Sequence, residues 1–193
     1  MTGEPTDSPA AVLHFWFGPE PLEPRQAWFS KDPAFDAAIG ERFGDRVEEA
    51  LAGGLTDWRS RDGGPLARVL LLDQFTRNLH RGSARAFAGD PLARAEALAL
   101  IDAGLDQALP PLQRVFVYLP LEHAEDPGLQ RRSVSLFEAL AQASPPLAAY
   151  ADFARRHQAV VERFGRFPHR NRALGRASTA AERAWLAQPG SGF

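Results

Sequence analysis

Apolar residues recur every third or fourth position along most of the chain, which is the period of an α-helix buried on one face. Between Asp32-Pro33 and Gly53-Gly54 the apolar side chains are spaced four apart, at Phe35, Ile39, Phe43 and Val47. No stretch alternates convincingly between apolar and polar residues with a period of two. The pattern therefore predicts an all-α protein without a β-sheet.

Proline, glycine and capping residues predict where these helices begin and end. The predicted helices cover about residues 8–17, 33–52, 65–81, 91–103, 111–119, 128–143, 146–164 and 180–188. Capping residues precede three of them: Asp7 or Ser8, Asp32, and Ser178 or Thr179 with Glu182 as the capping-box partner. Pro120 follows an apolar run and is expected to kink or break its helix.

The predicted helix over about residues 65–81 combines two patterns. Its first half is apolar on all sides, which is typical of a helix buried in the core. Its second half places polar side chains on one stripe: Asp73, Gln74, Arg77, Asn78 and Arg81. Residues four apart face each other on a helix, so Asp73 is expected to pair with Arg77 and Gln74 with Asn78. The stripe either completes this paired network or lines a binding site.

Length and composition narrow the class of protein. A chain of 193 residues with 45% apolar and 24% charged residues predicts one globular domain over residues 1–193. The absence of cysteine excludes disulfides, a thiol nucleophile and cysteine-containing zinc sites. Neither a signal sequence nor an apolar run long enough to span a membrane is present, so the sequence predicts a cytoplasmic protein.

Charge is distributed unevenly, although the net charge is only -2. Residues 1–54 carry ten acidic against four basic residues, and residues 155–176 carry seven arginines against one glutamate. The small net charge provides no overall field for nucleic acid or for an anionic membrane, so neither is expected as a partner. Only Lys31 is lysine among the 22 basic residues, which indicates a general preference for arginine.

Four clusters, taken in order, resemble one bacterial family. They are His14–Gly18 with Trp28–Asp32, Leu72–Asn78, Tyr118–His123, and Arg163–Asn171 with Leu174–Arg176. The chain is similar to the family catalogued as domain of unknown function 924. The resemblance implies a fold similar to tetratricopeptide-repeat proteins, with stacked antiparallel helix hairpins in a right-handed superhelix or bundle. It implies no activity. Thr76 occupies a position at which the family often has proline, which should leave a more regular helix.

Two further groups of polar residues complete the candidate site. Glu122, His123 and Glu125 directly follow Pro120, and the basic segment contributes Arg166, His169, Arg170 and Asn171. We expect these residues and the polar stripe (Asp73, Gln74, Arg77, Asn78) to converge in a pocket for a small anionic or zwitterionic molecule. Arginine would supply charge to such a ligand, and the amides would orient it.

Alternative interpretations of the same residues remain open. Asp73, Glu122 and His123 are candidate acids and bases of a hydrolase that uses the same pocket. An open charged groove would instead bind a protein or peptide partner, as helical repeats often do. The basic segment also suits a purely structural role in which it pairs with acids such as Asp73, Glu122 and Glu125. No cofactor is predicted, and no metal site, because His123, His157 and His169 match no metal-binding motif.

Overall fold

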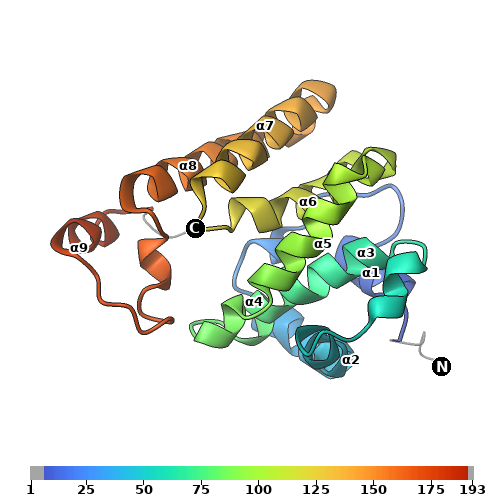
Figure 1. Cartoon of the computed structure of the whole chain (residues 1–193). Helices are drawn as coiled ribbons and strands as arrows, with labels where there is room; N and C mark the ends of the chain where they lie inside the picture. The colour runs from blue at the N-terminus through green and yellow to red at the C-terminus, as the bar shows by residue number, and fades with distance from the viewer. Residues whose placement is uncertain (1–6, 191–193) are drawn as a thin grey trace. The chain divides into compact units, whose positions relative to one another are not determined.

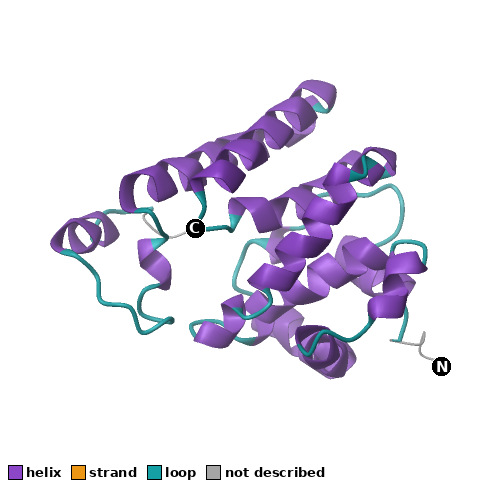
Figure 2. Cartoon of the chain, in the orientation of Figure 1, coloured by secondary structure: helices purple, strands orange, loops and turns teal. Residues whose placement is uncertain are grey.

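The computed structural model describes residues 7–190, and these residues form helices without any β-strand (Figures 1 and 2). The all-α prediction is confirmed. The α-helices are α1 (Pro9–Phe17), α2 (Pro33–Leu51), α3 (Gly64–Val69), α4 (Thr76–Leu79), α5 (Asp90–Asp102), α6 (Pro111–Glu122), α7 (Pro127–Ala143), α8 (Ala148–Phe164) and α9 (Ala180–Leu186). Short helical turns lie between several of them.

Contacts divide the chain into two compact units. The first unit contains the chain up to Arg81 together with Arg85–Pro120, and the second contains Gly82–Ala84 and the chain from Leu121 onward. Helices α1 to α5 and most of α6 therefore belong to the first unit, while α7 to α9 belong to the second. The last residues of α6, Leu121 and Glu122, are the first of the second unit's main segment.

The predicted helix caps are formed by side chains at the expected positions. Ser8 accepts a hydrogen bond from the backbone N–H of Ala11, and Asp32 caps α2 in the same manner. Thr179 and Glu182 form the predicted capping box at the start of α9. Local sequence therefore determines these helix starts before any packing is considered.

A continuous helical segment runs through the centre of the first unit. It consists of α3, the π-helix η3 (Leu70–Phe75) and α4, and it contacts α1, α2 and α5. The apolar half of the segment is buried, as predicted: Leu66, Val69, Leu70, Leu71, Leu72 and Phe75. Burial of these side chains fixes the direction in which the polar residues of the same segment point.

The π-helical turn was not expected, because Thr76 was predicted to leave a regular helix. The Thr76 hydroxyl donates to the carbonyl oxygens of Leu72 at 2.8 Å and of Asp73 at 3.2 Å. Arg77 Nη1 also donates to the Asp73 carbonyl at 2.6 Å. These side-chain donors satisfy carbonyl groups at the point where the wider π-helical ladder gives way to α4. Turns of this kind are rare and often occur at functional sites.

Glycine permits the close approach of α5 to this segment. A Cβ atom added at Gly89 would lie 2.1 Å from the carbonyl oxygen of Leu72, so no larger residue fits without a shift of backbone. Gly89 immediately precedes α5, and α5 packs against η3. The contact between α5 and the π-helical turn therefore depends on the missing side chain at Gly89.

The second unit is built on α7 and α8, which pack along each other. The short turn η6 (Pro145–Leu147) joins them, and Gly165 ends α8 with a φ of 70°. After α8 the chain forms η7 (Pro168–Arg170) and then α9. Phe167 lies in an apolar cluster with Val160 and Val161 of α8, and Trp185 of α9 packs at its edge.

Two expectations about helix boundaries were wrong. The helix α6 continues through Pro120 to Glu122, so the proline does not break the helix, although its missing N–H leaves the ladder one bond short. The predicted helix over residues 146–164 begins as the η6 turn and becomes α-helical only at Ala148. Among the described residues, no helix is long and apolar enough to cross a membrane.

Candidate functional site

Ion pairs hold the polar stripe of the first unit in place. Arg77 Nη1 lies 3.0 Å from Asp73 Oδ1 and 2.9 Å from Asp90 Oδ1, so the predicted pairing of Asp73 with Arg77 is confirmed. Burial acts to lower the pKa of Arg77, but the two carboxylates outweigh it and raise that pKa. The other terminal nitrogen, Nη2, is buried and makes no hydrogen bond to the residues that the structure describes.

The two amides of the stripe do not pair with each other, contrary to the prediction. Gln74 Nε2 donates to Asp73 Oδ2 at 2.6 Å, whereas Asn78 Nδ2 donates to Asp36 Oδ1 of α2 at 2.7 Å. Arg81 binds both oxygens of the same Asp36 carboxylate. Burial acts to raise the pKa of Asp36, but the bonds from Arg81 and Asn78 lower it. The π-helical turn at Gln74 changes the spacing on which the expected amide pair depended.

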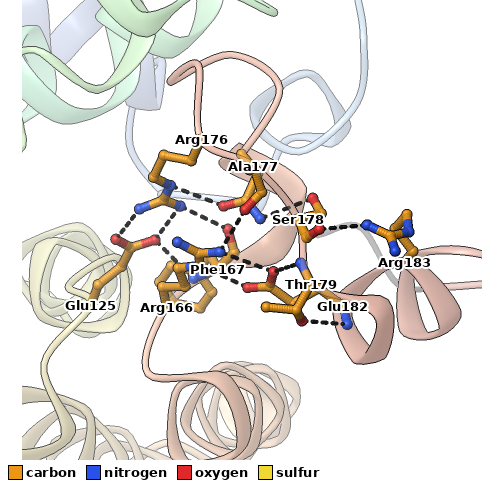
Figure 3. Close-up of polar contacts among 10 residues, drawn as sticks. Glu125, Arg166, Phe167, Arg176, Ala177, Ser178, Thr179, Glu182 and Arg183 are labelled. Carbon is orange, nitrogen blue, oxygen red and sulfur yellow. Dashed lines mark hydrogen bonds and ion pairs between the residues drawn. The ribbon is translucent and has the colours of Figure 1, made fainter.

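In the second unit, Glu125 organises the start of the basic segment (Figure 3). Arg176 binds Glu125 through Nη1 at 2.6 Å and Nη2 at 2.8 Å, and the backbone N–H of Phe167 donates to Oε1 at 2.8 Å. Burial acts to raise the pKa of Glu125, but these hydrogen bonds lower it. Arg176 Nε also donates to Asn171 Oδ1 at 2.9 Å, so Glu125 and Asn171 belong to one hydrogen-bonded network.

Arg166 has a comparable role at the other end of this segment. Its Nε and Nη2 bind the two carboxylate oxygens of Glu182 at 2.7 and 2.9 Å, and Nη2 also reaches the Ala177 carbonyl. The hydrogen bonds from Arg166 and from the Thr179 N–H lower the pKa of Glu182 to about 2. The prediction that the basic segment pairs with acidic residues is thus confirmed for Glu125. The partner of Arg166 is Glu182, which the sequence had predicted only as a helix-capping residue.

Of the remaining predicted residues of the second unit, His169 and Arg170 lie at the buried ring of Phe167. Glu122 and His123 lie beside His157, which contacts the same ring. We call this group the Phe167 cluster: Glu122, His123, His157, Phe167, His169 and Arg170. The Arg170 guanidinium carbon lies 4.5 Å from the Phe167 ring centroid, and the ring centroids of His157 and His169 each lie 5.5 Å from that of Phe167. The His123 ring is 6.3 Å from that of His157. Cationic, imidazole and phenyl groups therefore share one packed site.

Burial determines the charge of the histidine next to Arg170. Desolvation, followed by the nearby charges of Arg170, His157 and His123, lowers the pKa of His169 to about 3, and Glu125 opposes this shift. His169 is consequently a neutral imidazole at neutral pH, able to donate one hydrogen bond and accept another. Glu122 contacts the neighbouring His157, with its Oε1 3.0 Å from His157 Nδ1.

The chain matches the model of one protein family from residue 12 to residue 190, under the description "Bacterial protein of unknown function (DUF924)". This chain belongs to the DUF924 family. A solved structure similar to this DUF924 chain is titled "Structure of Protein of Unknown Function ATU0120 from Agrobacterium tumefaciens". It is 42% identical with a TM-score of 0.83, and the match covers 93% of this chain and 96% of that one. No curated protein matches.

In the sequence of this DUF924 chain, His157 was considered only as a distant metal ligand and was not placed in the candidate site. His157 lies on the buried face of α8, together with Ala154, Val160 and Val161. The helical spacing of these residues therefore indicated only a core position for the ring. The available signal was a histidine at a core position of the helix that directly precedes the basic segment. A buried imidazole needs a hydrogen-bond partner, and the acidic residues after Pro120 were candidates for that partner.

Two other observations concern the rest of the described part of this DUF924 chain. Among residues 7–190, no group of three or more histidine or acidic side chains could hold a metal ion. An open surface hollow of about 420 Å³ lies between α7 and α8, lined by Glu138, Ala141, Gln142 and Arg155. None of the predicted site residues lines this hollow, and two of its lining residues, Arg155 and Glu138, form an ion pair at 2.7 Å.

Proposed function

We propose that this DUF924 protein binds a small anionic or zwitterionic molecule at the Phe167 cluster of the second unit. One observation carries the proposal. Glu122 is 3% exposed, and its Oε2 is buried without a hydrogen-bond partner among the described residues. A buried polar atom in this condition costs about 1–3 kcal/mol. A ligand ammonium group that reaches Oε2, after a small side-chain movement, removes that cost.

Arg170 supplies the opposite charge in the same cluster. Its side chain is buried, and its guanidinium carbon lies over the face of the Phe167 ring at a distance typical of a cation–π contact. A planar guanidinium binds a carboxylate or phosphate through two parallel hydrogen bonds. With Arg170 for the acid group and Glu122 for the amine, the cluster favours a zwitterion over a simple anion.

The proposal does not depend on the polar stripe of the first unit. Asp73, Gln74, Arg77 and Asn78 bind one another and the carboxylates of Asp36 and Asp90. Their convergence with the second-unit residues in a single pocket stays a prediction, as does a single domain over residues 1–193. The stacked-hairpin fold similar to tetratricopeptide repeats is likewise part of the proposal, supported by the close packing of α7 on α8.

A thermal-shift and calorimetric titration tests this binding. The ligands are succinate and inorganic phosphate as anions, γ-aminobutyrate as a zwitterion, and butylamine as a cation. A ligand at about 100 times its dissociation constant stabilises the folded state by about 2.7 kcal/mol. We expect γ-aminobutyrate and succinate to raise the melting temperature, and butylamine to leave it unchanged.

Arg170→Gln provides the critical variant, with Arg163→Gln as its matched control. Arg163 also lies over a phenyl ring, 4.8 Å from the centroid of Phe164, but its side chain is exposed. We expect Arg170→Gln to abolish the shift and Arg163→Gln to preserve it; Arg170→Lys, which keeps the charge, should retain weaker binding. No shift with any of the four ligands, or an equal shift in wild type and Arg170→Gln, overturns the proposal.

A further inference from the structure

The residues of the Phe167 cluster that carry opposite charges are closed off from solvent. Glu122 is 3% exposed and Arg170 is 6% exposed, and Phe167 is not exposed at all. A ligand reaches such residues only when a neighbouring segment moves. Buried sites commonly open through a loop that moves aside and then closes again over the bound molecule. The segment of the second unit that opens most easily is therefore the one to identify.

Residues 172–178, which join η7 to α9, are held less firmly than the helices around them. We call this segment the strap. It forms no helix, and none of its residues is buried. Its backbone is held by single hydrogen bonds, such as that from the Leu174 N–H to the Arg170 carbonyl at 2.9 Å. Segments with few buried apolar side chains open at a lower free energy than packed helices do.

One arginine fixes the middle of the strap to the rest of the unit (Figure 3). Arg176 uses all three side-chain nitrogens. Nη1 and Nη2 bind Glu125, Nη2 also donates to the Phe167 carbonyl at 3.1 Å, and Nε donates to Asn171. The side chains of Arg176 and Glu125 are 23% and 25% exposed, so water reaches this ion pair. A partly exposed pair breaks more easily than a fully buried one.

The end of the strap next to α9 is held by different side chains. Arg166 donates to the Ala177 carbonyl at 2.9 Å, and Arg183 donates to the Ser178 carbonyl at 2.6 Å. These bonds do not involve Arg176. Release of Arg176 therefore frees the middle of the strap while its connection to α9 persists.

Arg176 also joins the two segments that supply the opposite charges of the cluster. Glu125 follows Glu122 by three residues, and Phe167 precedes Arg170 by three. One guanidinium binds the side chain of Glu125 and the backbone of Phe167, so it holds these segments together. A second link between them, from the Phe167 N–H to Glu125 Oε1 at 2.8 Å, uses the same carboxylate.

We propose that the ion pair of Arg176 and Glu125 is a latch that controls entry of the zwitterionic ligand to the Phe167 cluster. When the latch opens, the strap and the turn over residues 167–171 move away from Glu125, and the ligand enters between Glu122 and Arg170. The latch then closes over the occupied site. This inference rests on the proposed function and adds the way in which that site opens.

Hydrogen exchange of the full-length protein without ligand tests whether the latch holds the strap. Loss of a hydrogen bond to a charged group shifts an equilibrium by about tenfold or more. Arg176→Gln and the isosteric Glu125→Gln should therefore speed exchange of the Leu174 amide by about that factor. The amide of Gly165, which donates to a carbonyl of α8 at 2.7 Å, should exchange at the wild-type rate.

Arg155→Gln is the matched control for this measurement. Arg155 forms an ion pair with Glu138 in the same unit, and both side chains are about half exposed. Neither residue bonds to the strap. We expect Arg155→Gln to leave the exchange of the Leu174 amide unchanged.

The kinetics of γ-aminobutyrate binding, measured by NMR exchange, test whether the strap gates the site. We expect Arg176→Gln and Glu125→Gln to raise the association and dissociation rates together, each by about tenfold or more. Their ratio, the Kd, should change much less, because the latch closes over the empty and the occupied site alike. Arg176→Lys keeps the charge without the planar fork and should give intermediate rates. A merely structural contact would leave both rates as they are.

The outcomes separate this inference from the proposed function. Unchanged exchange of the Leu174 amide in both latch variants overturns the latch. Faster exchange combined with wild-type binding rates does so as well, and in both cases the proposed function stands. If the wild type binds neither γ-aminobutyrate nor succinate, the proposed function fails and the latch fails with it.

Discussion

Each unit of the molecule buries a carboxylate beside a cationic or titratable partner, and the two partners differ in kind. In the first unit Asp73 is fully buried and faces Arg77, with Asp90 on the same guanidinium. In the second unit Glu122 is 3% exposed and faces the imidazole of His157. Arginine is a permanent cation that only donates hydrogen bonds, whereas an imidazole carries two distinct ring nitrogens. Asp73 therefore faces a cation, and Glu122 faces an aromatic ring.

This difference separates the two interpretations that the sequence left open. Arg77 joins two carboxylates and a backbone carbonyl of the central segment, as expected for a group that stabilises the fold. Arg176 and Arg166 do the same for the second unit through Glu125 and Glu182. The Phe167 cluster instead surrounds its charges with rings. Pairs of arginine and carboxylate thus form the framework of each unit, and the ring-lined group is where we propose the binding site.

The largest effect on stability is expected from removing Arg77, which pairs with two carboxylates in the first unit. Arg77→Ala removes the cation that holds Asp73 and Asp90, and loss of one partner of a buried pair typically costs about 3–5 kcal/mol. Urea denaturation should show this decrease in the free energy of unfolding. Ligand binding at the Phe167 cluster should persist below the new transition. A folded and stable Arg77→Ala protein that no longer binds succinate would reverse the assignment and make Arg77 a ligand residue.

The helix caps and the Asp73–Arg77 pair could be predicted from the sequence, because both depend on residues that are close together along the chain. Ser8, Asp32 and Thr179 cap helices because their side chains fit the free N–H groups beside them. Asp73 and Arg77 pair because four residues make one helical turn. The π-helical turn at Leu70–Phe75 and the partner of Asn78 were not accessible. Both depend on how α2 and the central segment pack, which the periodicity of a single helix does not encode.

An effect of intermediate size on stability is expected from the protonation of His169. Measuring it tests whether the Phe167 cluster responds to pH. Burial and Arg170 lower the pKa of His169 from 6.5 to about 3. Between these values the unfolded chain binds a proton at this residue and the folded chain does not, so stability falls as the pH falls. From pH 7 to pH 5 the loss attributable to this group is about 2 kcal/mol.

His169→Gln should remove this part of the pH dependence while leaving the protein folded. The measurement is urea denaturation of both proteins at several pH values between about 5 and 7, where the difference between them should narrow as the pH falls. Glu125, whose pKa is lowered on folding, loses its stabilising effect at lower pH values and acts equally in both proteins. Parallel curves for the two proteins would mean that His169 does not titrate as a buried imidazole.

The candidate site was only partly accessible from sequence. Glu122 and Arg170 were predicted from their residue types, but the partner of Glu122 is a histidine on a helix whose spacing indicated only core. Arg166 and Asn171 were predicted to bind a ligand and instead bind Glu182 and Arg176. Residue type thus shows which side chains can bind a charge. Only the fold decides whether the protein itself supplies that charge.

The smallest expected effect concerns a neutral polar group of the second unit. Ser133 of α7 is fully buried, and its hydroxyl makes no hydrogen bond to the described residues. Ser135, on the same helix, is exposed and donates to the Arg131 carbonyl at 3.1 Å. Ser133→Ala removes a desolvated hydroxyl without creating a large cavity, so it should raise the free energy of unfolding by up to about 1 kcal/mol. Ser135→Ala should change it by less than about 0.5 kcal/mol. If Ser133→Ala is the more destabilising of the two, the Ser133 hydroxyl helps to hold the second unit together. The second unit would then resemble the first more closely than the contrast between Arg77 and His157 implies.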